Sequence, residues 1–164
     1  MAIYNGSTKL KELYVGNVKI KEAYVGSTCV YRSNYENYIL RIVTRGPETL
    51  VIKRLQVNGT TATLKSGRKK TTNGNWVNLS SSDLNQICAN GNTLQVGYDY
   101  TNLELTFDGI TQIPTSVSWF TDEYYAPPIY LSAYFIGINN GVETELGSLL
   151  EERQGQGKTF TITI

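Results

Sequence analysis

The sequence predicts an all-β protein with two parts, a short N-terminal β-repeat module and an antiparallel β-sandwich of jelly-roll or Ig-like topology. Three observations lead to this prediction. The first 32 residues repeat a ten-residue pattern three times. Short stretches rich in Val, Ile, Thr, Tyr and Phe, separated by turn residues, recur along the rest of the 164-residue chain. The helical crossovers that a parallel sheet requires are missing from the pattern, which favours antiparallel pairing.

The repeat units are residues 3–12, 13–22 and 23–32, and each has a tyrosine two residues before a Gly-Ser or Gly-Asn pair. Such a pair favours a type II′ hairpin turn. With the turn at Gly16-Asn17, Val15 faces Val18, Leu13 faces Ile20, and Lys11 and Glu12 face Glu22 and Lys21. Neither face of a unit is apolar throughout, so a bulge near Lys11-Glu12 or a corner between two strands is needed, and the choice between them stays open.

Residues 1–33 are therefore expected to form an attachment or oligomerisation module, and residues 34–164 the β-sandwich domain. Three ten-residue units bury too little apolar surface to be stable alone in water, so the module needs a neighbour, either the rest of the chain or another subunit. Unpaired strand edges at Ile3 and Val30 would favour docking to another chain. The candidate assembly residues are Ile3, Tyr4, Gly6, Leu13, Tyr14, Gly16, Ile20, Tyr24, Gly26 and Val30.

The second part shows alternating strand patterns and turn signals in order along the chain. Its turns are predicted at Asn58-Gly59, Asp108-Gly109 and 139–141, where residues that accept positive φ stand between apolar runs. One short helix is predicted at 83–89, with Asp83 and Gln86 as a capping box and Gly91 as its stop. Loops are predicted at 66–75 and 124–128, and a loop or a brief helical turn at 148–157. The predicted strands are 38–43, 49–57, 60–64, 76–79, 93–98, 103–107, 110–113, 117–121, 129–138, 142–146 and 158–164.

Composition argues against several classes of protein. The formal net charge is +1, so no long-range field would attract nucleic acid, and the basic run Arg68-Lys69-Lys70 is interpreted as a solvated turn. The sequence has neither a membrane-span pattern nor a secretory-leader pattern, so we expect a soluble protein without a membrane partner. Cys29 and Cys88 do not have metal-type spacing and are expected to be two free thiols.

Histidine is absent, which removes the commonest general base and a usual zinc ligand. We therefore expect no enzyme, no catalytic residue, no metal and no cofactor. A polysaccharide-degrading enzyme would require paired carboxylates converging in one cleft.

The chain has 12 tyrosines, which either fill the space between sheets or subunits or present aromatic surface to a ligand. Tyr124 and Tyr125 stand beside prolines in a predicted loop and are the candidate ligand-facing aromatics. Together with Trp119 or Trp76 they would form a platform on which sugars could stack.

The block from Ile3 to Tyr31 resembles the Tyr-Val-Gly-Ser/Asn-x-Lys repeats found near the N-terminus of bacteriophage virion structural proteins of the head-fibre, capsid-decoration and tail-associated types. The resemblance covers about a fifth of the chain. It implies a protein located in the virion, with the repeat-bearing end as an attachment module, other capsid or tail proteins as partners, and a β domain that projects outward. Cys29 stands where Lys9 and Lys19 stand in the earlier units, and end repeats commonly differ in this way.

On these grounds we expect a capsid-bound head fibre or decoration protein that forms a homo-oligomer, most simply a trimer. The alternative is a tail-associated receptor- or carbohydrate-binding module that contacts a host-surface glycan.

Overall fold

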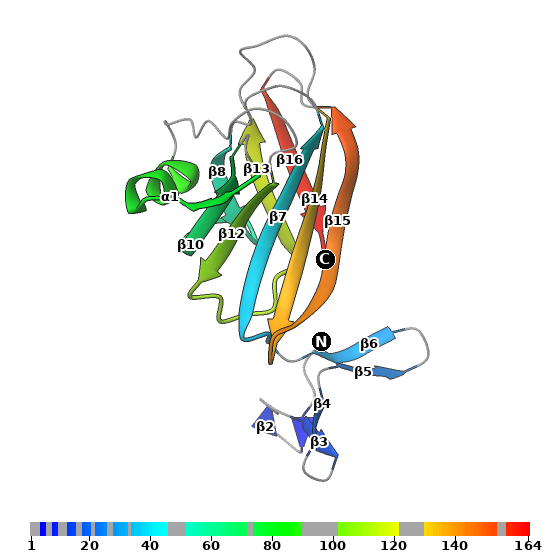
Figure 1. Ribbon diagram of the computed structural model, residues 1–164. Helices are drawn as coiled ribbons and strands as arrows, with labels where there is room; N and C mark the ends of the chain where they lie inside the picture. Colours follow the sequence, from blue (N-terminus) through cyan, green and yellow to red (C-terminus); the bar gives the residue numbers. More distant parts are fainter. Residues whose placement is uncertain are drawn as a thin grey trace. The chain divides into compact units, whose positions relative to one another are not determined.

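The computed structural model describes residues 4–5, 8–9, 13–15, 18–20, 22–25, 28–32, 34–45, 52–71, 74–89, 102–121, 130–153 and 157–164. The chain divides into two compact units (Figure 1). The first comprises Met1–Tyr35 with Thr111–Ile113, and the second comprises Glu36–Ile110 with Pro114–Ile164. Strands make up most of the described residues, which confirms the all-β class.

The described strands of the first unit form three antiparallel hairpins, one for each stretch around a Gly-Ser or Gly-Asn pair. In the middle hairpin Leu13 faces Ile20 and Val15 faces Val18, which is the register predicted from the sequence. Lys11, Glu12 and Lys21, for which further pairing was predicted, lie outside the described residues. The six strands are β1 (Tyr4–Asn5), β2 (Thr8–Lys9), β3 (Leu13–Val15), β4 (Val18–Ile20), β5 (Glu22–Val25) and β6 (Thr28–Arg32).

In its described residues, the second unit is built from two antiparallel sheets with one short helix, α1 (Ser81–Cys88). The six-stranded sheet has the order β11-β10-β12-β7-β14-β15, and the four-stranded sheet has the order β16-β13-β8-β9. Figure 1 shows β13 and β16 behind β7 and β14, so the sheets form two layers. The strands are β7 (Asn37–Arg45), β8 (Lys53–Val57), β9 (Thr60–Thr61), β10 (Thr63–Lys70), β11 (Trp76–Asn78), β12 (Asn102–Asp108), β13 (Ser116–Thr121), β14 (Tyr130–Asn139), β15 (Val142–Arg153) and β16 (Lys158–Thr163).

The core lies between the two layers and follows the two-residue period of the strands. On the six-stranded side, Phe135 stacks on Tyr38 and meets Phe107 edge-on, with ring centroids 5.6 Å apart in both pairs. On the four-stranded side, Trp119 stacks on Phe160 at 5.5 Å. Because these alternate positions fill the core, the residues between them face outward. The largest fully buried side chains are Trp119, Phe135, Phe160, Leu40, Ile42, Ile52, Leu55, Ile87, Leu103, Leu105 and Leu131.

Two of the predicted turns are confirmed. Asn58 and Gly59 have φ values of 53° and 75° and connect Val57 to its partner Thr60, as a type I′ hairpin requires. Asn140 and Gly141, with φ values of 51° and 75°, connect β14 to β15 in the same way.

The hairpin predicted at Asp108-Gly109 is wrong. Gly109 has a φ of 65° and donates its N–H to the Asp108 carboxylate, but residues 110–113 do not form a strand. The reason is that both edges of β12 are already occupied, one by β10 and the other by β7, so the chain leaves the sheet.

Two predicted loops are in large part strands. β10 continues to Lys70, so Arg68-Lys69-Lys70 is part of the six-stranded sheet and not a solvated turn. β15 continues to Arg153, and bulges opposite Leu131–Ala133 and Phe135–Ile136 accommodate its extra residues beside β14. Charged and glycine-rich sequence predicted loops in both places, but pairing to neighbouring strands outweighed the local composition.

The predicted helix exists but begins earlier. Ser80 is the N-cap and forms a capping box with Asp83, whereas the prediction placed the box at Asp83 and Gln86. Ile87 is fully buried where α1 packs against β8 and β10. Gly91 and the predicted strand 93–98 lie outside the described residues.

Candidate functional site

The outer face of the six-stranded sheet carries a network of ion pairs between residues on four of its strands. Strand register places Glu104 of β12 directly between Arg41 of β7 and Arg68 of β10. Arg41 Nε donates to Glu104 Oε1 at 2.7 Å, and Arg68 Nε donates to Glu104 Oε2 at 2.6 Å. The two terminal nitrogens of Arg41 donate to the Glu143 carboxylate of β15 at 3.1 and 3.0 Å. We refer to these four residues as the Arg-Glu network.

Glu104 lies at the centre of the network and its side chain is only 7% exposed. A nearly buried carboxylate requires compensating charge and hydrogen bonds, which the two guanidinium groups supply. The hydrogen bond with Glu143 raises the pKa of Arg41, and the same bond lowers the pKa of Glu143. Two positive and two negative charges cancel, so the network carries no formal net charge.

Arg68 is held from a second direction by Trp76. Its guanidinium carbon lies 4.4 Å from the centre of the Trp76 ring, in a cation–π arrangement. Trp76 itself is 38% exposed on the edge strand β11. The ring face that Arg68 covers is therefore not open to a sugar. The contacts with Trp76 and Glu104 together fix the position of the Arg68 guanidinium.

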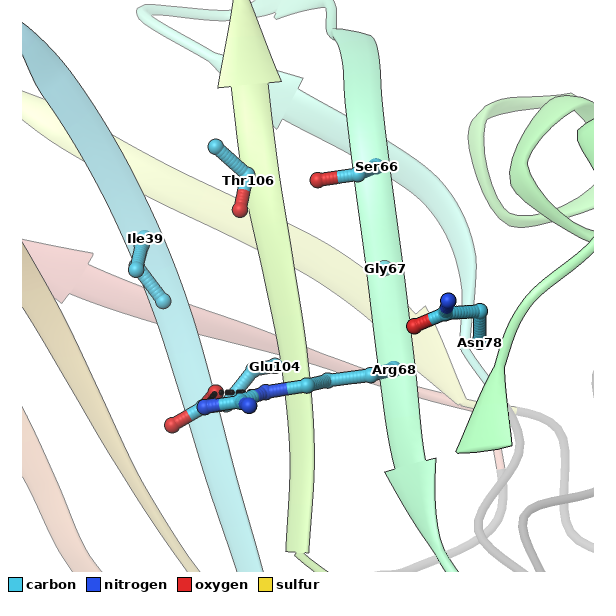
Figure 2. Close-up of a pocket in the computed structure, with 7 residues that line it drawn as sticks. All are labelled: Ile39, Ser66, Gly67, Arg68, Asn78, Glu104 and Thr106. Carbon is cyan, nitrogen blue, oxygen red and sulfur yellow. Dashed lines mark hydrogen bonds and ion pairs between the residues drawn. The ribbon is translucent and has the colours of Figure 1, made fainter. Parts of the chain in front are cut away.

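A shallow pocket of about 180 Å³ lies beside Arg68 on this face. Figure 2 shows the Arg68 side chain reaching across β12 to Glu104, with Ser66 and Thr106 farther along the same strands. Strand register explains this arrangement, because Ser66 pairs with Thr106 and Thr106 pairs with Ile39. The lining residues are Ile39, Ser66, Gly67, Arg68, Asn78, Glu104 and Thr106.

Gly67 of β10 lies between the pocket residues Ser66 and Arg68, and a side chain at this position would point to the inner side of the sheet, where neighbouring side chains approach closely. A Cβ at Gly67 would lie 2.9 Å from Leu79 and Leu84 and 3.0 Å from Leu105. The buried side of β10 at this point is thus filled by residues that connect it to α1 and β12. The pocket residues of β10 are therefore held on a strand whose inner side is well packed.

The structure places only some of the predicted assembly residues. Tyr4, Tyr14 and Tyr24 occupy equivalent positions, paired with Lys9, Lys19 and Cys29 respectively. Leu13 and Ile20 face each other, and Val30 lies in β6. Ile3, Gly6, Gly16 and Gly26 lie outside the described residues.

The predicted ligand-facing aromatics have a mixed outcome. Tyr124 and Tyr125 lie outside the described residues. Trp119 is fully buried against Phe160, so the proposal that it forms part of a sugar platform is wrong. The pocket residues were not singled out from the sequence, although Glu104 and Thr106 alternate with Leu103, Leu105 and Phe107, a pattern that indicates outward-facing polar positions.

Two further features concern metal sites and thiols. Within the described ranges, no group of three or more His, Cys, Asp or Glu residues could hold a metal ion. Cys88 is a half-buried free thiol, and burial raises its pKa to about 11. Cys29 lies in β6, and its side chain is not described.

No helix in the described part of the chain is long and apolar enough to span a bilayer. In comparisons with known proteins, no family model, curated protein or solved structure matches the chain.

Proposed function

We propose that this chain is a bacteriophage virion structural protein without enzymatic activity, a capsid-bound head fibre or decoration protein anchored through its N-terminal repeats. The observation that carries the proposal is the hairpin repeat. The first tyrosine of each unit pairs with the residue five positions later, so a repeat in sequence is also a repeat in backbone pairing. Repeated small units of this kind present equivalent groups at regular intervals, which suits assembly with other chains.

The energetics of the repeat unit favour a partner. An isolated two-stranded hairpin is marginally stable in water, and the pairing between described strands of this unit stays within each hairpin. The second unit has its own aromatic and aliphatic core and does not depend on the repeats for a buried interior. We therefore assign attachment and oligomerisation, most simply as a trimer, to the repeats, and surface decoration to the two-layered unit. A β-sandwich of jelly-roll or Ig-like topology for that unit is part of the proposal.

The proposal is tested in the full-length chain by replacing the repeated tyrosines together, as Tyr4→Ser, Tyr14→Ser and Tyr24→Ser. The matched control is Tyr130→Ser, because Tyr130 is 48% exposed at the start of β14 in the second unit. Light scattering measures the molar mass of each purified protein. Co-sedimentation measures attachment to virions of the phage that encodes it.

We expect the triple variant to lose oligomerisation and attachment to virions while the control retains both. Attachment of the triple variant at the level of the unmodified protein would refute anchoring through the repeats. If the triple variant loses attachment, electron cryomicroscopy of the intact particle identifies the proteins that contact the first 33 residues. It also shows whether this protein lies on the head or, as in the alternative, on the tail.

A further inference from the structure

We propose that the pocket on the outer face of the six-stranded sheet binds one neutral sugar ring of a glycan, through Ser66, Asn78, Thr106 and Arg68. The inference does not depend on a role in a virion, because it is drawn from the pocket alone. It also differs from a platform built on Tyr124 and Tyr125, which would stack sugars on aromatic rings.

The size of the pocket limits its occupant. Sites for drug-sized ligands occupy about 300–1,000 Å³. At about 180 Å³ this pocket is smaller and open to solvent along the sheet, so it suits a single ring at the end or within a longer chain.

The polar groups around the pocket match a ligand that carries several hydroxyl groups. Among the described residues, no hydrogen bond engages the side chains of Ser66, Asn78 or Thr106. A serine or threonine hydroxyl and an asparagine amide each donate and accept, as sugar hydroxyls do. Arg68 uses Nε and one terminal nitrogen on Glu104, and its other terminal nitrogen can donate to a ligand.

Charge argues for a neutral ligand. The Arg68 guanidinium faces the pocket together with the Glu104 carboxylate that neutralises it, and Arg41 is shared between Glu104 and Glu143. An anionic ligand would gain attraction from Arg68 and meet repulsion from Glu104. Ile39 adds an apolar surface of the kind that the C–H face of a sugar ring contacts.

The site is also preorganised. All seven lining residues lie on strands of one sheet. Arg68 is fixed between Glu104 and the Trp76 ring, so little side-chain entropy is lost when it binds.

The test uses the full-length protein and ligand-observed NMR with methyl glycosides of neutral hexoses, deoxyhexoses and N-acetylhexosamines, each at up to about 10 mM, a range that detects affinities near 1 mM. Thr106→Val removes one pocket hydroxyl at nearly constant shape. Thr161→Val is the matched control, because Thr161 is exposed on β16 of the other sheet. Ser66→Ala and Asn78→Ala, at exposed positions, provide variants that should fold even where Thr106→Val does not.

We expect at least one neutral glycoside to bind, and its dissociation constant to rise tenfold or more in Thr106→Val, Ser66→Ala and Asn78→Ala while Thr161→Val binds as the unmodified protein does. Three outcomes would overturn the inference: no binding to any neutral glycoside, binding that survives all three pocket variants, or binding confined to acidic sugars added as a comparison.

Discussion

Glu104→Gln tests how much the Arg-Glu network contributes to stability. The substitution keeps the shape of the side chain and removes its charge. The amide oxygen of glutamine can accept from one guanidinium, but its amide N–H₂ would face the other, so one favourable contact becomes a contact between two donors. The change therefore acts on both ion pairs without opening a cavity.

The size of the effect follows from the exposure of the three side chains. Removing one partner of a fully buried ion pair costs about 3–5 kcal/mol. Here only Glu104 is nearly buried, at 7% exposure, whereas Arg41 and Arg68 are 29% and 50% exposed and can regain hydrogen bonds to water. We therefore expect a loss of about 2 kcal/mol in the free energy of unfolding, which corresponds to roughly 4–8 °C in Tm for a chain of this length.

Urea unfolding followed by tryptophan fluorescence measures the loss, because Trp119 is fully buried in the core. Glu145→Gln is the matched control: it removes the same charge from an exposed position on β15, and surface changes of this kind stay within about 0.5 kcal/mol. If Glu104→Gln is as stable as Glu145→Gln, the reasoning that the network stabilises the sheet is refuted.

Three further predictions concern α1. Ser80→Ala removes the capping hydroxyl, which accepts from Asp83 N–H at 3.2 Å, and should cost about 1 kcal/mol in urea unfolding at pH 7; an unchanged unfolding midpoint would contradict this. Hydrogen bonds from Ser80 lower the pKa of Asp83 below its usual 3.8. The Asp83 carboxylate therefore stabilises the protein fully above pH 3.8, and this contribution is lost as the pH falls through the lowered pKa. The difference in the free energy of unfolding between Asp83→Asn and the unmodified protein should therefore vanish in acid. The pKa of Cys88 is raised to about 11 from an ordinary 9.0, so its thiolate fraction at pH 8 should be about 100-fold lower than that of an ordinary thiol. In a Cys29→Ser background, the reaction of Cys88 with a disulfide reagent should therefore be slow and should accelerate up to about pH 11. A rate equal to that of free cysteine would count against burial of the thiol.

Local signals predicted those elements of the fold that depend on local geometry. Asn58-Gly59 and Asn140-Gly141 specify tight hairpins because both positions must accept positive φ, and the structure has them. β16 was predicted from the alternation of Phe160 and Ile162 with threonines, and both residues are buried.

The predictions that are wrong concern segments whose structure depends on pairing with a strand distant in the sequence. Arg68-Lys69-Lys70 has the composition of a turn, but Glu104, 36 residues later, neutralises Arg68 in the sheet. Asp108-Gly109 has the composition of a hairpin, but β7 and β10 already occupy the edges at which the returning strand would pair. Strand order is a property of the whole chain, and local patterns carry little information about it.

The same limit explains why the pocket could not be predicted. Ser66, Asn78 and Thr106 are ordinary polar residues in separate segments, and only the pairing of β10 with both β11 and β12 brings them together. The outward orientation of Glu104 and Thr106 could be predicted from alternation along β12, but not which side chains would lie beside them.

The Arg-Glu network connects the stability of the sheet to the proposed sugar site. Ion pairs removed from water are often no more stabilising than apolar residues of the same volume, so stability alone does not account for a nearly buried glutamate flanked by two arginines. On this face, apolar replacements would create an exposed hydrophobic patch across the middle of the sheet. The network avoids that patch, and it fixes Arg68 at the border of the pocket while cancelling its charge. A fixed, neutralised guanidinium can donate hydrogen bonds to an uncharged ligand without selecting anions, which is the property that a neutral sugar site requires.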